Sequence, residues 1–402
     1  MLGFSVAHAD GDTSPLLLAA NTKAQSSNAE TSVQTSGTKT SILPSNAVGL
    51  DGNSQSIFKF NGFGTLATTH SSQRDGDYVP DSILPSGAGR SSEWSTSNDS
   101  RLGLHVAANI SPKISAVLQV ISEYQADNSY NPEVEWFNIK YSFNPDFFIR
   151  IGRIALPAML YSDSRDVGYS FPWIHPPVDV YRELTITHSD GIDAMYRWEF
   201  EGYENTVKVI LGQNVIDRPN ITSTEQGLRG IVDTVEYGPA LFKVGYHMRE
   251  SSFVNLQTGI SDPWVMYTDL SLGASYDPGE WFVLSEWLQR QSTTKVDSMY
   301  VTSGARIEKF TPYITYSTVS AASFFPSTPT PTATSILSSL RSQSTVSLGM
   351  RWDFMKKTDL KVQYDQVRLS SNSNGYLINV ARNAVLYGDR IDLISLAVDF
   401  VF

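Results

Sequence analysis

The sequence predicts an all-β fold, a transmembrane antiparallel β-barrel of about sixteen strands. Three observations lead to this prediction. The chain ends on a strand that alternates apolar and polar residues, stretches of about ten alternating residues recur along it, and the connections between them alternate between short and long.

The last twelve residues, Ile391–Phe402, alternate in polarity. Every second position is apolar, so a strand places these side chains on one face: Ile394, Leu396, Val398, Phe400 and Phe402. We expect a more polar mixture on the other face: Asp392, Leu393, Ala397 and Asp399. A strand that closes a barrel in a membrane needs this pattern, because one side meets lipid and the other meets the lumen.

The composition excludes several classes of protein. The chain has 402 residues and no Cys, which excludes disulfide frameworks, thiolate metal sites and Cys nucleophiles. A formal net charge of −11 argues against nucleic-acid binding. No run of 18 apolar residues exists, so a membrane could be crossed only by a closed barrel. The 19 Tyr, 19 Phe and 8 Trp are enough for aromatic girdles at both membrane surfaces.

The chain divides into three predicted parts. Residues 1–9 end in Ala7-His8-Ala9, which resembles a signal-peptide cleavage site, so we expect a signal-peptide remnant; a chance Ala-x-Ala is the alternative, because a positive n-region is missing. Residues 10–56 are rich in Ser, Thr, Asn, Gln and Ala, which predicts a flexible, low-complexity periplasmic segment. Residues 57–402 form the predicted barrel.

Sixteen stretches carry the strand pattern. They lie near Ile57–Thr68, Arg101–Ile110, Ile114–Tyr124, Val134–Phe143, Phe147–Ile154, Gly191–Phe200, Val207–Asn214, Leu228–Tyr237, Ala240–Arg249, Trp264–Tyr276, Trp281–Arg290, Met299–Ile307, Phe310–Val319, Thr345–Phe354, Leu360–Leu369 and Ile391–Phe402. Two of them are ambiguous. Trp281–Arg290 has apolar residues at both parities, and Leu228–Tyr237 has charged residues at both. Two explanations are open: the boundaries of the stretches are misplaced, or the outer wall contacts another subunit there.

The connections fall into two classes. The short ones carry turn residues: Ser111–Lys113, Asn144–Asp146, Gly238–Pro239, Asp277–Gly279 and Met355–Lys357. The long ones are mostly polar: His70–Ser100, Ala155–Asp190, Val215–Gly227, Ser251–Pro263, Ser320–Ser342 and Ser370–Arg390. Short turns on one rim and long loops on the other are typical of an outer-membrane barrel, with the short side periplasmic.

Alternation also predicts which side chains face outward. On the second stretch Leu102, Leu104 and Val106 point outward, whereas Arg101 and His105 point inward. A charge on the lipid face near the midplane costs about 2–4 kcal/mol, which favours this assignment. The same reasoning gives a predicted aromatic girdle: Phe137, Tyr141, Phe143, Trp198, Trp352, Phe354, Phe400 and Phe402.

The connection Ala155–Asp190 is unusually apolar for a loop. Its large side chains need cover: Met159, Leu160, Tyr161, Tyr169, Phe171, Trp173 and Ile174. A barrel of sixteen strands leaves an aqueous channel, so it has room for such a segment. We therefore expect this long loop after the fifth strand to fold into the lumen.

The order of these elements resembles the Gram-negative porin family. The resemblance covers about residues 57–402 and depends on Ser100–Leu104 opening the second strand, Ile151-Gly152-Arg153 closing the fifth, and the long loop directly after it. It implies a porin of the outer membrane, in which small hydrophilic solutes and ions diffuse passively through a pore narrowed by that loop. It also implies a homotrimer, contact with outer-membrane lipid and lipopolysaccharide, and no cofactor.

The resemblance further implies opposed charges at the constriction. The loop acids would be Asp163, Asp166, Asp179 and Glu183. The bases on the pore wall would be Arg101, Lys140, Arg150, Arg153, Arg197 and Arg351. Opposed charges create a transverse field that orders water and disfavours apolar solutes. The alternative for Asp163 and Asp166 is a solvated loop surface that pairs locally with Arg165.

Parts of the sequence depart from the resemblance. The Pro-Glu-Phe-Gly-Gly-like loop motif of general porins is missing, and Pro172–Pro177 is foreign to it. The general architecture therefore carries over better than the details of the constriction.

The sequence predicts no enzyme and no metal site. It contains neither Gly-x-Ser-x-Gly nor His-Glu-x-x-His, and none of its 6 His lies in a short motif with a nucleophile. Other functions remain open: a substrate-selective channel with an aromatic path for a sugar through Tyr169, Phe171 and Trp173, a channel for anions, or a surface recognition or structural barrel that uses its long outer loops. A soluble β-sandwich or propeller is the alternative fold.

Overall fold

The computed structural model describes residues 57–184, 186–217, 221–323 and 341–402. The expected signal-peptide remnant and the low-complexity segment, residues 1–56, lie outside the described residues. Most of the predicted connection Ser320–Ser342 also lies outside them.

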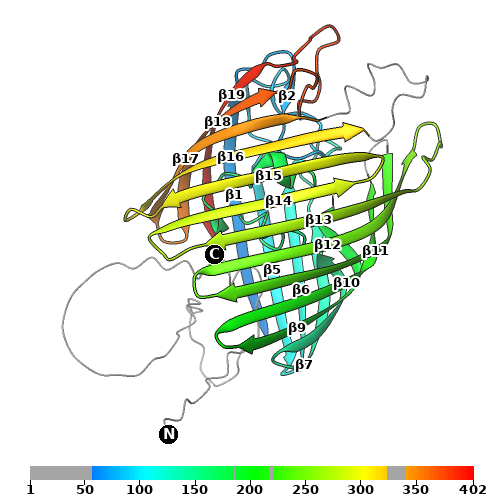
Figure 1. Cartoon of the computed structure of the whole chain (residues 1–402), viewed down its shortest axis with the longest axis vertical. Coiled ribbons are helices and arrows are strands. Elements are labelled where there is room, and N and C mark those ends of the chain that lie inside the picture. Colours follow the sequence, from blue (N-terminus) through cyan, green and yellow to red (C-terminus); the bar gives the residue numbers. More distant parts are fainter. Residues whose placement is uncertain (1–56, 185, 218–220, 324–340) are drawn as a thin grey trace.

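Sixteen long antiparallel strands close into a barrel (Figure 1). They are β1 (Phe58–Ser71), β5 (Arg101–Ser111), β6 (Ile114–Glu123), β7 (Glu133–Asn144), β8 (Phe147–Ala155), β9 (His188–Phe200), β10 (Tyr203–Asp217), β11 (Ile221–Tyr237), β12 (Ala240–Asn255), β13 (Val265–Tyr276), β14 (Trp281–Gln291), β15 (Thr294–Ala305), β16 (Phe310–Ser323), β17 (Gln343–Met355), β18 (Thr358–Leu369) and β19 (Arg390–Val401). Each pairs with its neighbour in the chain, and β19 closes the ring on β1, from Phe63 opposite Val401 to Ser71 opposite Leu393. The predicted fold class is confirmed, and the soluble sandwich is excluded.

The remaining elements are short. Three strands of two residues lie between β1 and β5: β2 (Asp77–Tyr78), β3 (Ala88–Gly89) and β4 (Trp94–Ser95). Between β8 and β9 lie a 3-10 turn, η1 (Gly168–Ser170), and one helical turn, α2 (Val178–Tyr181). In the described ranges, no helix has the length and apolar character that crossing a membrane requires.

Each predicted stretch coincides with a long strand, but one predicted connection is wrong. Val215–Gly227 is mostly strand, because β10 runs to Asp217 and β11 begins at Ile221. The pairing of these strands shifts register between Gly212 and Asn214, and that of β11 with β12 shifts between Gln226 and Arg229. An extra residue at each shift interrupts the alternation by which the sequence identifies a strand.

The turns on one rim are short, as predicted. Gly238 and Lys357 have φ values of 55° and 63°, the left-handed conformation that tight hairpins need. The opposite rim carries the longer segments after β1, β8 and β18. The blue segment that contains β2 and the red segment before β19 lie together at that end of the barrel (Figure 1).

Side chains alternate between the two faces of the wall. On β5, Leu102 and Leu104 are 53% and 45% exposed on the outer face, whereas His105 on the inner face is 1% exposed. On β19 the expected outer face is confirmed, but Asp392 was assigned to the wrong face. It shares the parity of Ile394, and it lies at the long-segment end of the strand, where it accepts a hydrogen bond from Tyr364.

Of the two ambiguous stretches, Trp281–Arg290 has correct boundaries, whereas Leu228–Tyr237 begins well inside β11, which starts at Ile221. On β14 the inner face is apolar because it is covered: Phe282, Leu284 and Leu288 are at most 5% exposed and belong to a buried cluster. The apolar residues at both parities of β14 therefore need neither misplaced boundaries nor a subunit contact as an explanation. On β11, Arg229 and Asp233 lie on the outer parity, so its charges do occur on both faces.

Candidate functional site

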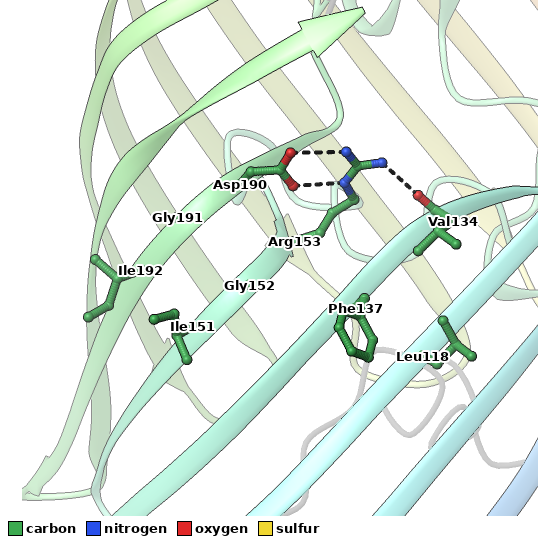
Figure 2. Close-up of a pocket in the computed structure, with 9 residues that line it drawn as sticks. All are labelled: Leu118, Val134, Phe137, Ile151, Gly152, Arg153, Asp190, Gly191 and Ile192. Atoms are coloured by element: carbon green, nitrogen blue, oxygen red, sulfur yellow. Dashed lines mark hydrogen bonds and ion pairs between the residues drawn. The ribbon is translucent and has the colours of Figure 1, made fainter.

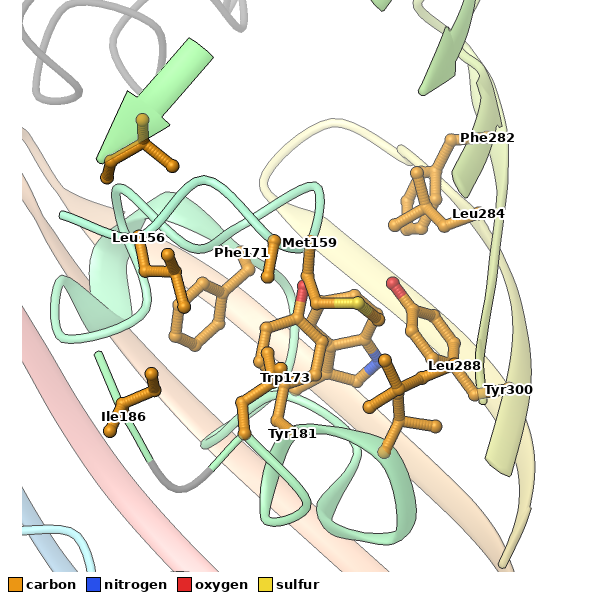
Figure 3. Close-up of a cluster of buried hydrophobic side chains, with 14 of the residues drawn as sticks. Leu156, Met159, Phe171, Trp173, Tyr181, Ile186, Phe282, Leu284, Leu288 and Tyr300 are labelled. Atoms are coloured by element: carbon orange, nitrogen blue, oxygen red, sulfur yellow. The ribbon is translucent and has the colours of Figure 1, made fainter. Parts of the chain in front are cut away.

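The segment between β8 and β9, described at residues 156–184 and 186–187, packs against inward-facing side chains of the barrel wall. Figure 3 shows its aromatic residues between the wall strands, with Trp173 beside Tyr300 of β15. Trp173 is 1% exposed and donates its indole N–H to Thr315 Oγ1 at 3.0 Å. The cluster joins side chains of the segment to apolar side chains of β10, β11 and β14–β16. The segment is therefore held against the wall by burial of apolar surface.

Basic side chains of the wall bind backbone carbonyl groups of this segment. The Lys361 ammonium donates to Gly168 O at 2.7 Å and Trp173 O at 2.8 Å, and it pairs with Asp399 at 2.8 Å. Lys243 donates to Met159 O at 2.6 Å. Gly168 fits so closely that a Cβ there would collide with the Asp399 carboxylate. These contacts fix the path of the backbone as well as its side chains.

Glu286 of β14 is a second attachment point. Its carboxylate accepts hydrogen bonds from the Tyr181 and Tyr300 hydroxyls, both at 2.7 Å, and from Leu160 N at 2.5 Å. A buried carboxylate is stable when donors satisfy it in this way. Glu286 therefore joins both ends of the segment to one strand.

The four predicted loop acids fall into two pairs. Asp179 and Glu183 are 0% and 5% exposed and anchor α2. Asp179 accepts from Ser317 Oγ at 2.7 Å and Gln343 Nε2 at 2.6 Å, while Glu183 accepts from Tyr376 Oη at 2.6 Å. Burial raises the pKa of Asp179 to about 6, against the effect of these donors. These two acids do not face open space.

Asp163 and Asp166 face the opposite side of the barrel. Asp166 lies 3.2 Å from the Arg101 guanidinium, which is also 3.7 Å from Glu123. Asp163 lies 3.8 Å from Lys208 Nζ, and its side chain is 39% exposed. Burial and Glu135 raise the pKa of Asp166, whereas Lys208, Lys243 and Arg150 outweigh burial and lower the pKa of Asp163. Arg165 is 4.0 Å from Asp166 and pairs more closely with Asp81, so local pairing is not the main contact.

Three predicted wall bases lie on the inner face near this charged side. Arg101 bridges Asp166 and Glu123. Arg150 forms a double hydrogen bond with Asp193, and Lys140 lies 5.4 Å from the Phe148 ring. The remaining three bases occupy other places.

Arg153 differs most from the expectation, because it lies on the outer face. It is paired across the strands with Phe137, an outward side chain that is 58% exposed. Figure 2 shows its guanidinium bonded to Asp190 at 2.8 and 3.0 Å and to Val134 O at 3.0 Å, beside an open hollow of about 850 Å³. The parity of β8 already indicates this face, because Arg153 shares the parity of the outward-facing Ile151.

Arg351 and Arg197 also have other partners. Arg351 donates to Tyr169 O at 2.6 Å and pairs with Asp359 at 3.1 Å, so it anchors the segment. Arg197 lies near the short turns, 3.3 Å from Asp146.

The predicted girdle residues point outward. Seven of them are between 37% and 60% exposed: Phe137, Tyr141, Phe143, Trp198, Trp352, Phe354 and Phe402. Phe400 stacks on Phe402, with ring centroids 6.5 Å apart. All except Phe137 lie on the half of the wall near the short turns.

Several functional candidates were missed. Lys208, Lys243, Lys361 and Glu286 lie on strands that the sequence predicts, and their inward parity was the available signal. Their loop partners are more than thirty residues away in sequence, so no local pattern identifies the contacts. Among the described residues, no group of three or more His, Asp or Glu is arranged to hold a metal ion.

Comparison with known proteins supports the fold. No protein-family model and no curated protein sequence matches the chain. The anion-selective porin from Comamonas acidovorans has a TM-score of 0.55 at 12% identity, covering 86% of this chain and 99% of that chain. OmpT, an outer-membrane protein of Vibrio cholerae, has a TM-score of 0.53 at 12% identity, covering 87% of this chain and 99% of that chain. The outer membrane channel DcaP of Acinetobacter baumannii has a TM-score of 0.51 at 9% identity, covering 87% of this chain and 99% of that chain. The chain therefore has a porin-like barrel fold.

Proposed function

We propose that the chain is an outer-membrane porin. Small hydrophilic solutes and ions diffuse passively through its water-filled lumen, and the segment between β8 and β9 folds into that lumen and narrows it. The observation that carries this proposal is a set of opposed charges inside a closed barrel. Asp163 and Asp166 of the segment face Lys208 and Arg101 of the wall at 3.8 and 3.2 Å, on a side where the charged groups remain partly exposed.

The outer wall supports a membrane location. Its large apolar side chains are exposed on strand after strand, including Leu102, Phe137, Ile151 and Leu348. Such a surface is stable against lipid hydrocarbon and unstable in water. The three neighbours reported above are described as a porin, an outer-membrane protein and an outer membrane channel, all from Gram-negative bacteria. We propose the Gram-negative outer membrane, with lipopolysaccharide and lipid around the barrel.

We propose a homotrimer as the assembly. One structure of the Vibrio cholerae protein, at 12% identity, is described as a trimer form. Chemical cross-linking of the purified protein, followed by gel electrophoresis without heating, tests this. Three linked copies support the trimer, and a single species at the monomer position contradicts it.

The proposed activity is transport without catalysis. Two described histidines on the inner wall, His105 and His247, are each 1% exposed, and His105 also bonds to Gln119 at 3.2 Å. An aromatic sugar path is not favoured, because Phe171 and Trp173 are at most 2% exposed. Anion preference is the second candidate, since Arg101, Lys140, Arg150 and Lys208 share the inner wall of β5–β10.

A planar-bilayer recording tests the proposal. Purified protein should give ohmic current steps, and the reversal potential under a salt gradient should report the preferred ion. A barrel that carries no current at any voltage would favour recognition or anchoring instead.

A further inference from the structure

Two outer segments are joined by their backbones. Asp77 N donates to Ile378 O at 2.8 Å, and Ile378 N donates to Asp77 O at 3.0 Å. Ala381 N donates to Asp75 O at 2.7 Å, and the Asn379 side chain donates to Asp77 Oδ2 at 2.7 Å. The segment before β5, residues 72–100, and the segment before β19, residues 370–389, are therefore paired like two strands.

Arg182 joins the third segment, residues 156–184, to these two. One nitrogen of its guanidinium donates to Val79 O at 2.6 Å and to Tyr376 O at 2.9 Å, and the group lies 4.7 Å from the Tyr376 ring. Arg182 is 4% exposed, and the adjacent Glu183 accepts from Tyr376 Oη. Because a guanidinium carries several N–H donors in one plane, a single Arg side chain can bind several carbonyl groups at once. A single residue thus contacts all three segments.

The joined segments cover an apolar part of the inner wall. They contribute Tyr78, Val178, Tyr376 and Leu386 to a buried cluster. The wall contributes inward side chains of β15, β16, β18 and β19: Val296, Val319, Val367, Leu369, Ile391 and Leu393. Each is at most 8% exposed. Exposing this apolar surface to water is unfavourable, so the packing of the joined segments against the wall is stabilised by the hydrophobic effect.

The inner wall on the other side of the barrel is not sealed in this way. Arg101, Glu123 and Lys208 have side chains that are 17%, 33% and 18% exposed. Their charged groups pair at distances of 3.2 to 3.8 Å, longer than the anchoring bonds of Lys361. These charged groups are therefore partly accessible to water, unlike the apolar wall under the joined segments.

We propose that residues 72–100, 156–184 and 370–389 form one fixed cap that closes the long-segment end of the barrel over β15–β19. Solutes then enter only along β5–β10, and Arg182 is the residue that holds the three segments together. The route for solutes rests on the proposed channel function, whereas closure of the cap does not. The cap does not open and close as a gate, because opening it would expose the apolar side chains of the wall to water.

Cysteine labelling tests closure without requiring any current. The chain has no Cys, so an introduced one is the only thiol. Val319 is 1% exposed under the cap, and Ser115, which is partly exposed on the inner parity of β6, provides the control position. With a small water-soluble thiol reagent on purified protein, Ser115→Cys should react readily and Val319→Cys should be protected. Equal rates at both positions overturn the cap.

Variants at Arg182 test its role. Arg182→Ala should raise the labelling rate of Val319→Cys by at least about tenfold, because it removes two hydrogen bonds from a charged donor. Arg182→Lys should raise the rate less. Arg382→Ala removes an exposed Arg from the same end of the barrel and should leave the rate unchanged. Heat-modifiable gel mobility identifies folded barrels in every variant, and unchanged protection in folded Arg182→Ala overturns its role.

A cross-link separates a fixed cap from a gate. Asp77 and Ile378 are opposite each other, at a separation that a disulfide can span, so Asp77→Cys with Ile378→Cys should oxidise to one bridge. The oxidised protein should conduct as the unmodified protein does, and loss of current only after oxidation overturns the fixed cap. If the unmodified protein itself carries no current, the channel proposal fails, while the labelling result still decides whether the cap is closed.

Discussion

The two sides of the inner wall differ in polarity, and this difference determines where the β8–β9 segment lies. On β14–β16 the inward side includes buried apolar and aromatic side chains, such as Leu284, Leu288 and Tyr300. On β5–β10 the inward side includes charged residues that remain partly exposed, such as Arg101, Arg150 and Lys208. The segment buries its aromatic side chains on the first side and meets the second through the partly exposed pairs of Asp163 and Asp166.

Physical chemistry explains the choice of side. Trp173 and Phe171 gain free energy by leaving water, and the apolar side chains of β14–β16 offer them contact. Covering Arg101 or Lys208 instead would strip water from an ionised group. The polarity of the inward-facing side chains of the strands, and not the sequence of the loop alone, therefore determines the position of the proposed pore.

The largest effect is expected from Trp173→Ala on the packed side. Removing this side chain should weaken docking of the segment by about 3–5 kcal/mol, the usual cost of deleting a buried aromatic group. It also removes the hydrogen bond to Thr315. Limited trypsin digestion of the purified barrel should then cleave within residues 156–184.

Trp198→Ala is the matched control, because that ring is 41% exposed on the outer face. Its digestion pattern should equal that of the unmodified protein. Resistance of Trp173→Ala to digestion would mean that the apolar side does not hold the segment.

Much of the fold follows from the sequence because a barrel strand is a local pattern. Alternation identified all sixteen long strands, and the turn residues identified five short connections. Errors arose where a register shift breaks alternation, as between Gly212 and Asn214, or where parity was counted incorrectly, as for Asp392.

The candidate site is harder to predict because its contacts are long-range. Sequence reasoning selected Asp163, Asp166 and Arg101, and the last two are in contact. It also selected Asp179, Glu183 and Arg351, which serve as anchors in the structure. Residue type alone cannot distinguish an acid that faces water from one that binds a distant strand. The roles of all these residues in permeation remain predictions.

A second large effect is expected from Lys361→Met. The change removes the donor to Gly168 O and Trp173 O and leaves the buried Asp399 without its ammonium partner. Breaking one half of a buried ion pair typically costs about 3–5 kcal/mol. Urea unfolding, followed by the gel mobility of the barrel, should show the loss. Lys356→Met, at an exposed turn, should leave the midpoint in place.

The docking of α2 should depend on pH through Asp179. Burial raises its pKa from 3.8 to about 6, so the docked segment binds a proton more tightly than the undocked one. Docking is then strongest below about pH 4 and weakens as pH rises through about 6, by up to about 3 kcal/mol. Hydrogen exchange of the amides of residues 178–184, corrected for intrinsic rates, measures this. Asp179→Asn should remove the pH dependence, and an unchanged dependence would assign it to another group, such as Asp365.

The smallest effect on stability, and the most direct one on selectivity, is expected from Asp163→Asn with Asp166→Asn. Both acids pair with partly exposed bases, and such pairs contribute about 0–1 kcal/mol each, so the barrel should fold normally. Removing two negative charges beside Arg101 and Lys208 makes the potential there more positive, which disfavours cations. The reversal potential under a salt gradient should therefore shift towards anion preference. Asp179→Asn removes an acid of the same segment that is 0% exposed on the packed side, so it should leave the reversal potential unchanged. If the double variant and Asp179→Asn shift it equally, permeating ions do not distinguish the two sides, and the charged side would lose its role as the path.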